Sequence, residues 1–350
     1  MKNAYRETHV GPIKGVRFAL IATIVMVMMV LQACGNNAST ANKEAPSSSG
    51  ESTEATSKVP AVLNYGYIGI NKLNVPSGGA EGWGLYKGII QEELKKSGIT
   101  EVKLTGFPNG PDQTESLISG RLDIGSLGDT PAIIAYGSGA KTRLITQTAA
   151  NNIGYLIGKK NGATTVKELE GKTIAIQKGS FMHRYVVGLL QEEGVTDYKL
   201  VHMLIADAGA ALARGDIDAT TNLGVGALKQ IDDGYTYLDD ASKHPDLLGT
   251  GATVVSEEYL AKFPDFPKVW NAAREKALAD LKQHEDEYYQ FLAEAGGTTP
   301  ELAKKVSPIS GINDTAFTEE GLKLLEGTKN FLVKEKLAKK EFQISDWQKQ

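Results

Sequence analysis

Two segments place small hydrogen-bond donors where an expected strand gives way to an expected helix. They are Ser126-Leu127-Gly128-Asp129-Thr130-Pro131 and Lys178-Gly179-Ser180-Phe181. Free backbone N–H groups and the positive end of a helix dipole favour an anion at such a junction. Capping of the helix by a Ser, Thr or Asp side chain would explain the same residues without a ligand. The segments therefore predict either an oxyanion site or two ordinary helix starts.

Phosphate-binding and metal-binding patterns are incomplete in this chain. Gly171-Lys172-Thr173 has the tail of a P-loop, but Val166 stands where the earlier glycine is required, and the segment enters a strand. Four scattered histidines lack the spacing of a metal site: His183, His202, His244 and His284. The sequence therefore predicts no metal and no cofactor.

Ser180 and His183 allow a second class of function. With an acid such as Asp207 they could supply the nucleophile, base and orienting acid of an exported serine hydrolase. However, they stand three residues apart at a helix start, and no Gly-x-Ser-x-Gly elbow surrounds the serine. Binding is therefore favoured, and hydrolysis is kept as the alternative.

From Val59 onward, short apolar runs alternate with helical patterns in two series, from LNYGYIGI to RLITQTA and from YLIGKK to ALKQIDDG. This alternation predicts mainly parallel sheets with helices on their faces. Four glycines mark expected helix ends: Gly98, Gly120, Gly194 and Gly215. After Val255 the pattern is helical, with amphipathic stretches over about 267–295 and 318–336. Two similar halves suggest two lobes, with a cleft beyond the carboxyl ends of their strands.

Several motifs occur in a fixed order between about residues 62 and 238. They are Phe107-Pro108-Asn109-Gly110-Pro111, Gly128-Asp129-Thr130-Pro131, Gln177-Lys178-Gly179-Ser180 with His183, Ala206-Asp207-Ala208 and Gly215-Asp216-Ile217-Asp218-Ala219. In this order they resemble the aliphatic-sulfonate-binding branch of the nitrate, sulfonate and taurine solute-binding proteins of ABC importers. The resemblance implies an α/β, two-lobed periplasmic-binding-protein-like fold (type II), with two mixed sheets flanked by helices and a ligand cleft between the lobes. Lobe 1 would be residues 59–149 plus 249–350, and lobe 2 residues 150–248.

The same resemblance implies a monomeric, non-enzymatic binder that delivers a small anionic solute to a permease. The solute is expected to be an aliphatic sulfonate, with nitrate, taurine, an aromatic sulfonate or a pyrimidine precursor as alternatives. Candidate ligand-binding residues are Ile70, Asn71, Trp83, Ser126, Asp129, Thr130, Ser180, Phe181, His183 and Asn222. Because a carboxylate repels an anion, Asp129 is expected to cap or orient Thr130, while Trp83 is either an apolar wall or a core residue. The family often has two tryptophans after the Asp218-Ala219 pair, and their absence here predicts a wider pocket or a different ligand.

The first 33 residues have the pattern of a signal peptide. Four basic side chains precede an uncharged run from Phe18 to Leu31, which as a helix would span about 21 Å, short of the roughly 30 Å hydrocarbon layer. The run ends in Leu31-Gln32-Ala33-Cys34, which resembles the lipobox of bacterial lipoproteins. Two acyl chains on Cys34 would hold the protein at the extracytoplasmic face of the cell membrane.

Composition and charge narrow the function further. Cys34 is the single cysteine among 350 residues, so an intramolecular disulfide is excluded. Residues 34–58 are mostly small and polar and predict a flexible tether. Because residues 1–33 carry four basic side chains and one acidic one, their removal takes the formal net charge from −4 to −7. Nucleic-acid affinity comes mainly from neutralising phosphates, so this acidic chain is not expected to bind nucleic acid.

Overall fold

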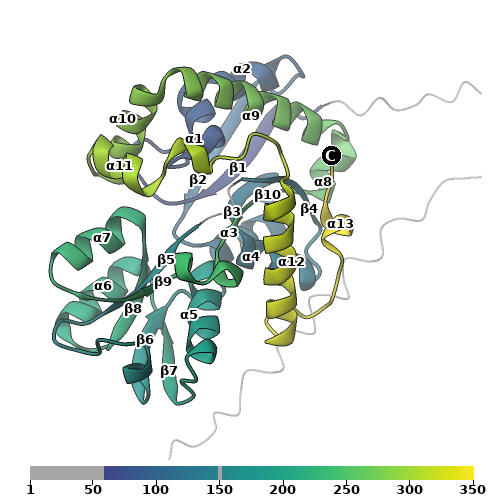
Figure 1. The fold of residues 1–350 in the computed structure, drawn as a ribbon. Coiled ribbons are helices and arrows are strands. Elements are labelled where there is room, and N and C mark those ends of the chain that lie inside the picture. The colour runs from purple at the N-terminus through teal and green to yellow at the C-terminus, as the bar shows by residue number, and fades with distance from the viewer. Residues whose placement is uncertain (1–58, 149–151) are drawn as a thin grey trace, which may run out of the picture. The chain divides into compact units, whose positions relative to one another are not determined.

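The computed structural model describes residues 59–148 and 152–350, which contain two five-stranded sheets, each with its own helices (Figure 1). The expected signal peptide, the lipidation site Cys34 and the tether lie outside the described residues. Within the described part, no helix combines the length and the apolar character needed to cross a membrane.

The first sheet has the strand order β2-β1-β3-β10-β4. Its strands are β1 (Val62–Ile68), β2 (Glu101–Phe107), β3 (Ile124–Gly128), β4 (Thr142–Gln147) and β10 (Gly251–Ser256). β1 is parallel to β2 and β3, whereas β10 runs antiparallel to both β3 and β4. The sheet is therefore mixed, and its strand β10 comes from a distant part of the chain.

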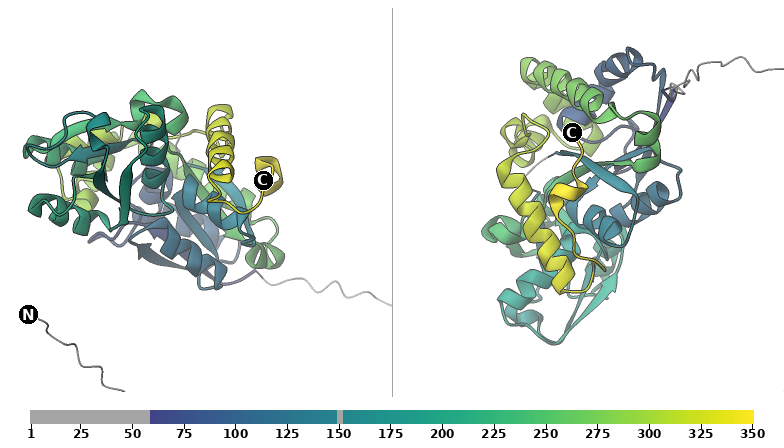
Figure 2. Two further views of the ribbon diagram at one scale, coloured as in Figure 1. Left: turned by 90° about the horizontal axis from the view of Figure 1, so that it is seen from below. Right: turned by 90° about the vertical axis from the view of Figure 1, so that its right-hand side faces the viewer.

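Helices cover both faces of the first sheet. They are α1 (Gly79–Tyr86), α2 (Ile89–Lys95), α3 (Gly110–Ile118), α4 (Asp129–Gly137), α8 (Glu257–Lys262), α9 (Phe266–Gln283), α10 (Glu285–Gly296), α11 (Pro300–Val306), α12 (Glu319–Lys334) and α13 (Ile344–Trp347). Successive strand residues alternate between two cores, so that Val255 packs with α9 while Val254 packs with α4 and α12. The C-terminal helices α12 and α13 lie side by side on the second of these faces (Figure 2).

The second sheet has the order β7-β6-β8-β5-β9. Its strands are β5 (Gly154–Gly158), β6 (Lys172–Ile176), β7 (Tyr198–His202), β8 (Ala219–Leu223) and β9 (Thr236–Asp240). β6 is parallel to β7 and β8, and β5 is antiparallel to β8 and β9. Ile174 packs toward α5 (Phe181–Glu192), whereas its neighbour Ala175 packs toward α6 (Ile205–Arg214) and α7 (Gly224–Asp232).

The chain crosses between the two sheets twice, and the crossing segments pair with each other. The Asn152 N–H donates to the Gly249 carbonyl at 2.8 Å, and the reverse bond is 3.1 Å long. A Cβ at Gly249 would come within 2.6 Å of the Phe181 ring, so only glycine lets the backbone approach this closely. The fold class expected from the sequence is confirmed. The exact lobe boundaries stay a prediction.

The four glycines expected at helix ends all adopt a positive φ, as the sequence predicts. The long amphipathic stretch over 267–295 is not one helix, because the chain leaves helical geometry at His284 (φ −126°, ψ 44°) between α9 and α10. The expectation of mainly parallel sheets is wrong in one respect. The strands β5 and β10 run antiparallel to both of their neighbours, and neither directly follows an α-helix as the βα alternation would require.

Candidate binding cleft

A cavity of about 670 Å³ lies between the lobes and is lined from both sheets. Its polar lining includes Asn109, Ser126, Thr148, Asn152, Tyr155, Gln177 and Ser180. Its apolar lining includes Ile68, Leu127, Ile153, Phe181, Met182, Ile205, Leu223, Leu228 and Val306. A cavity of this size that is mostly apolar, with a few polar groups, is typical of a small-molecule site.

Several helices begin at this cavity, among them α3, α5 and α7, because each follows the carboxyl end of a strand. Asn109 caps α3 by accepting a hydrogen bond from the Asp112 N–H at 2.9 Å, and Ser180 caps α5 through its bond from the His183 N–H at 3.3 Å. α7 begins at Gly224 in the cavity wall. The first amides of a helix have no intrahelical acceptor, so those of Phe181 and Met182 are available to an anion.

Of the ten residues predicted from the sequence, Ser126, Ser180 and Phe181 line the cavity. The Ser126 hydroxyl lies 3.2 Å from the Thr253 hydroxyl. The Ser180 hydroxyl donates to the Gln177 carbonyl at 2.7 Å, which fixes the turn before α5. Ser180 and Phe181 thus lie at the cavity wall, and an anion site at the start of α5 stays a prediction.

Asp129 and Thr130 do not line the cavity, because they are buried beneath it. Both the N–H and the hydroxyl of Thr130 donate to the Asp129 carboxylate, so Thr130 has no donor left for a solute. The other Asp129 oxygen lies 3.5 Å from the guanidinium of Arg184, and both of these side chains are 0 % exposed. The expectation that Asp129 orients Thr130 fits this geometry, but a direct role for Thr130 in binding does not.

Arg184 ties the two lobes together at this point. From α5 it donates to the carbonyls of Asp246 and Leu248, at 3.2 and 2.7 Å, in the segment that leads back to the first sheet. Burial lowers the pKa of Arg184, and the charge of Asp129 opposes that shift. The Thr250 N–H completes the network by donating to Asp129 at 3.2 Å.

Trp83 is a core residue and not a wall of the cleft. It is fully buried, its Nε1 donates to Asp280 at 2.7 Å, and its ring contacts Tyr288 and Phe291. Packing and hydrogen bonding between α1, α9 and α10 therefore explain the position of the Trp83 side chain without a ligand.

The remaining predicted residues lie near the cavity without lining it. Ile70 is 76 % exposed. Asn71 donates to the Val75 carbonyl and to Ser77, and so holds the loop that carries Pro76 into the cavity wall. Asn222 is occupied by Gln230 and by the Leu223 N–H. The His183 Nδ1 accepts from the Gly179 N–H at 3.2 Å and so braces the start of α5.

Acid is expected to destabilise the protein through His183. Burial, with the nearby charge of Lys178, lowers the pKa of His183. The unfolded chain therefore takes up the proton more readily, and stability that is complete above about pH 6.5 falls as the pH drops below it. Urea unfolding across this range measures the effect. His183→Gln should flatten the profile, and an unchanged slope in that variant would contradict the assignment.

No local sequence pattern predicts that the C-terminal part of the chain reaches the cleft. Lys305, Val306 and Ser307, at the end of α11, line the cavity. Their local pattern is that of an ordinary helix end, so only the fold brings them there. Within the described residues, no group of three His, Cys, Asp or Glu side chains is placed to hold a metal ion.

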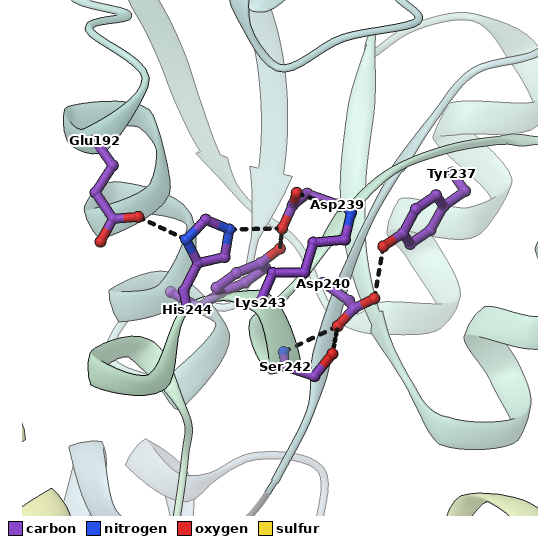
Figure 3. Close-up of polar contacts among 8 residues, drawn as sticks. Glu192, Tyr237, Asp239, Asp240, Ser242, Lys243 and His244 are labelled. Carbon is purple, nitrogen blue, oxygen red and sulfur yellow. Dashed lines mark hydrogen bonds and ion pairs between the residues drawn. The ribbon is translucent and has the colours of Figure 1, made fainter.

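A polar cluster away from the cavity fastens the second crossing segment to α5 (Figure 3). His244 lies between two carboxylates, with Nδ1 2.6 Å from Glu192 and Nε2 2.9 Å from Asp239. Tyr185 donates to Asp239 at 3.2 Å. The cluster therefore joins β9, α5 and the chain that returns to the first sheet.

We expect His244→Ala to lower the free energy of unfolding by about 1 kcal/mol, because two partly exposed hydrogen bonds are lost. Chemical denaturation measures this. Lys243→Ala removes a more exposed partner of Asp239 and should have a smaller effect. An equal loss in both variants would argue against a bridging role for the imidazole.

The two mixed sheets, the paired crossing segments and the cleft define a two-lobed protein of the periplasmic-binding-protein fold. The chain belongs to the NMT1/THI5-like family, whose sequence model matches residues 90–288. A Bacillus subtilis (strain 168) protein named for binding aliphatic sulfonates is 26 % identical over 272 residues, covering 74 % of this chain and 79 % of the relative. An Escherichia coli (strain K12) protein of the same name is 33 % identical over 137 residues, covering 37 % and 41 %.

Solved structures share the two-lobed fold. The alkanesulfonate-binding protein SsuA of Xanthomonas axonopodis pv. citri, bound to MOPS, has a TM-score of 0.68 at 22 % identity, covering 83 % of this chain and 98 % of SsuA. The periplasmic aliphatic sulphonate-binding protein SsuA of Escherichia coli has a TM-score of 0.63 at 22 % identity, covering 83 % and 92 %. The desulfurization enzyme DSZB, at 16 % identity, also has a TM-score of 0.63, covering 83 % and 96 %. These TM-scores establish the fold. Together with the family match and the curated relatives, they confirm the resemblance to sulfonate-binding proteins that the motifs predicted.

Proposed function

We propose that this protein is the extracytoplasmic solute-binding component of an ABC importer and that its cleft binds an aliphatic sulfonate. The observation that carries the proposal is the start of α5, where the free amides of Phe181 and Met182 meet an apolar cavity wall. The names of the relatives from Bacillus subtilis and Escherichia coli support the same solute class.

In this proposal the sulfonate oxygens accept hydrogen bonds from the α5 amides and from the Ser126 hydroxyl. Each bond to a charged ligand is worth about 1.5–3 kcal/mol. Three of them would supply much of the roughly 8 kcal/mol of a micromolar affinity. The carbon chain would lie against apolar side chains such as Leu127, Met182 and Leu223.

The apolar wall favours an organic sulfonate over nitrate, which has no carbon chain to bury. Taurine, an aromatic sulfonate and a pyrimidine precursor remain alternative solutes. The hydrolase alternative is not favoured, because the Ser180 hydroxyl donates to a backbone carbonyl while the His183 Nδ1 faces the Gly179 N–H. Asp207 lies exposed in the first turn of α6.

We further propose that the segment before residue 59 serves transport. A cleaved leader, a lipidated Cys34 and a tether would keep the monomeric binder at the membrane beside its permease. An intact mass of membrane-extracted protein tests lipidation, and a Cys34→Ala form that stays equally membrane-bound would contradict it.

Thermal unfolding of the full-length chain in mild detergent, with a panel of sulfonates, nitrate, sulfate and pyrimidines, tests the solute class. A ligand at 1,000 times its dissociation constant should stabilise the protein by about 4 kcal/mol. Ser126→Ala should weaken sulfonate binding about tenfold, whereas Ser119→Ala, on the exposed end of α3, should leave it unchanged. Stabilisation by a pyrimidine alone would overturn the sulfonate assignment.

A further inference from the structure

A second cavity, of about 410 Å³, adjoins the main one. The two share part of their walls, including Pro76, Ser126, Thr148, Asn152 and Lys305. The rest of the second cavity is lined by the start of α1, by α9 and α10, and by Pro308, Gly311 and Ile312 after α11. The helices α1, α9 and α10 lie together at one end of the first lobe (Figure 1). We call this second cavity the side pocket. Because the walls are shared, one solute can extend from the main cavity into the side pocket.

The side pocket contains a buried guanidinium with unused donors. Arg274, on α9, is 1 % exposed and lines the side pocket. Its Nη2 donates to the Asn313 carbonyl at 2.5 Å, and the strongest opposite charge near it is the carboxylate of Glu81, which lines the same pocket. A guanidinium carries five N–H donors in a planar fork that matches a carboxylate. Burial lowers the pKa of Arg274 more than the charge of Glu81 raises it, and a bound anion would offset the rest of this cost.

Glu81 lines the same pocket, but its carboxylate is already satisfied. It accepts hydrogen bonds from Tyr65 at 2.9 Å, Thr253 at 2.7 Å and Trp270 at 3.2 Å. These three donors hold Glu81 in place and occupy both of its oxygens. The pocket therefore offers open donors on Arg274, with the exposed ammonium of Lys305 on the shared wall, rather than an open acceptor.

We propose that the side pocket binds a second acidic group of the solute, a carboxylate held by Arg274. The preferred solute is then a sulfonate that carries a carboxylate at its other end. This inference rests on the proposed function, which places the sulfonate at the start of α5. A plain alkanesulfonate would fill the main cavity and leave the side pocket to water.

Isothermal titration of the full-length chain in mild detergent can compare propanesulfonate, 3-sulfopropanoate and 3-aminopropanesulfonate. The carboxylate should tighten binding about tenfold or more over propanesulfonate, because it adds charge-assisted hydrogen bonds. Arg274→Gln should abolish this advantage and leave propanesulfonate affinity nearly unchanged. Lys276→Gln is the matched control, because it removes an exposed cation of α9 that pairs with Glu93, and it should retain the advantage.

Equal affinity of the wild-type protein for propanesulfonate and 3-sulfopropanoate would overturn the inference while leaving the proposed function intact. Tighter binding of 3-aminopropanesulfonate would also overturn the inference, since Glu81 would then be the group that recognises the far end of the solute. If no sulfonate binds, the proposed function and the inference both fail. The wild-type comparison needs no variant, so poor folding of Arg274→Gln would not prevent the test.

Discussion

Replacing Asp129 with alanine is expected to lower the free energy of unfolding by about 3–5 kcal/mol, because it leaves Arg184 as an uncompensated buried charge. The change also removes the acceptor for the Thr250 N–H and the Thr328 hydroxyl, each at 3.2 Å. Other contacts would not compensate for the lost carboxylate, since the Nε of Arg184 is already buried without a partner among the described residues. Urea unfolding followed by circular dichroism measures the loss.

Two further variants test whether the loss of stability comes from the orphaned charge of Arg184. Glu258→Ala removes a carboxylate that is 75 % exposed and should change stability by less than about 0.5 kcal/mol. Adding Arg184→Met to Asp129→Ala should recover part of the loss, because the orphaned charge is gone. If the losses of the two single variants simply add in the double variant, the ion pair is not what joins α4 to α5.

Trp83→Ala should lower stability by a similar amount, about 3–5 kcal/mol, because a large aromatic side chain is removed from a closed core. The indole ring centre lies 5.9 Å from the ring centres of both Tyr288 and Phe291. Since Trp83 does not line the main cavity, the protein that remains folded should bind its solute with unchanged affinity. Thermal unfolding with and without solute measures both quantities.

Trp83→Phe is the matched control for this core position. It keeps most of the ring packing and loses the hydrogen bond to Asp280, so its effect should be clearly smaller. A Trp83→Ala protein that is stable but has lost its solute affinity would instead make the indole a wall of the cleft.

Local pattern was enough to predict the parallel part of the fold. The helices that follow β2, β6 and β7 each end just before a glycine that adopts a positive φ. Strand β10 could not be predicted from periodicity alone. Its residues, Gly251–Ser256, insert between β3 and β4, and the partners of an edge-to-edge pairing leave no mark on the local sequence. The mixed character of the sheets came from the family resemblance.

The residues of the candidate site also differ in whether the local sequence predicts them. Ser180 and Phe181 were found because a capped helix start after a strand has a local signature. Thr130 was assigned to the solute because sequence does not show that the Asp129 carboxylate already takes both of its donors. Lys305 and Arg274 lie more than ninety residues from those motifs, and neither stands in a local pattern that signals a ligand. Their position in the cleft is a property of the tertiary fold.

The placement of β10 also sets an order of folding. All five strands of the second sheet lie within residues 154–240, so that sheet can form from contacts that are close in sequence. The first sheet stays divided until Gly251–Ser256 joins β3 to β4. This step closes a longer loop than any in the second sheet, so it costs more conformational entropy. Pulse-labelled hydrogen exchange during refolding should therefore protect β6 and β8 before β4. A chain truncated before residue 251 would then carry one finished lobe and one open sheet edge, which is the kind of surface that chaperones and proteases recognise.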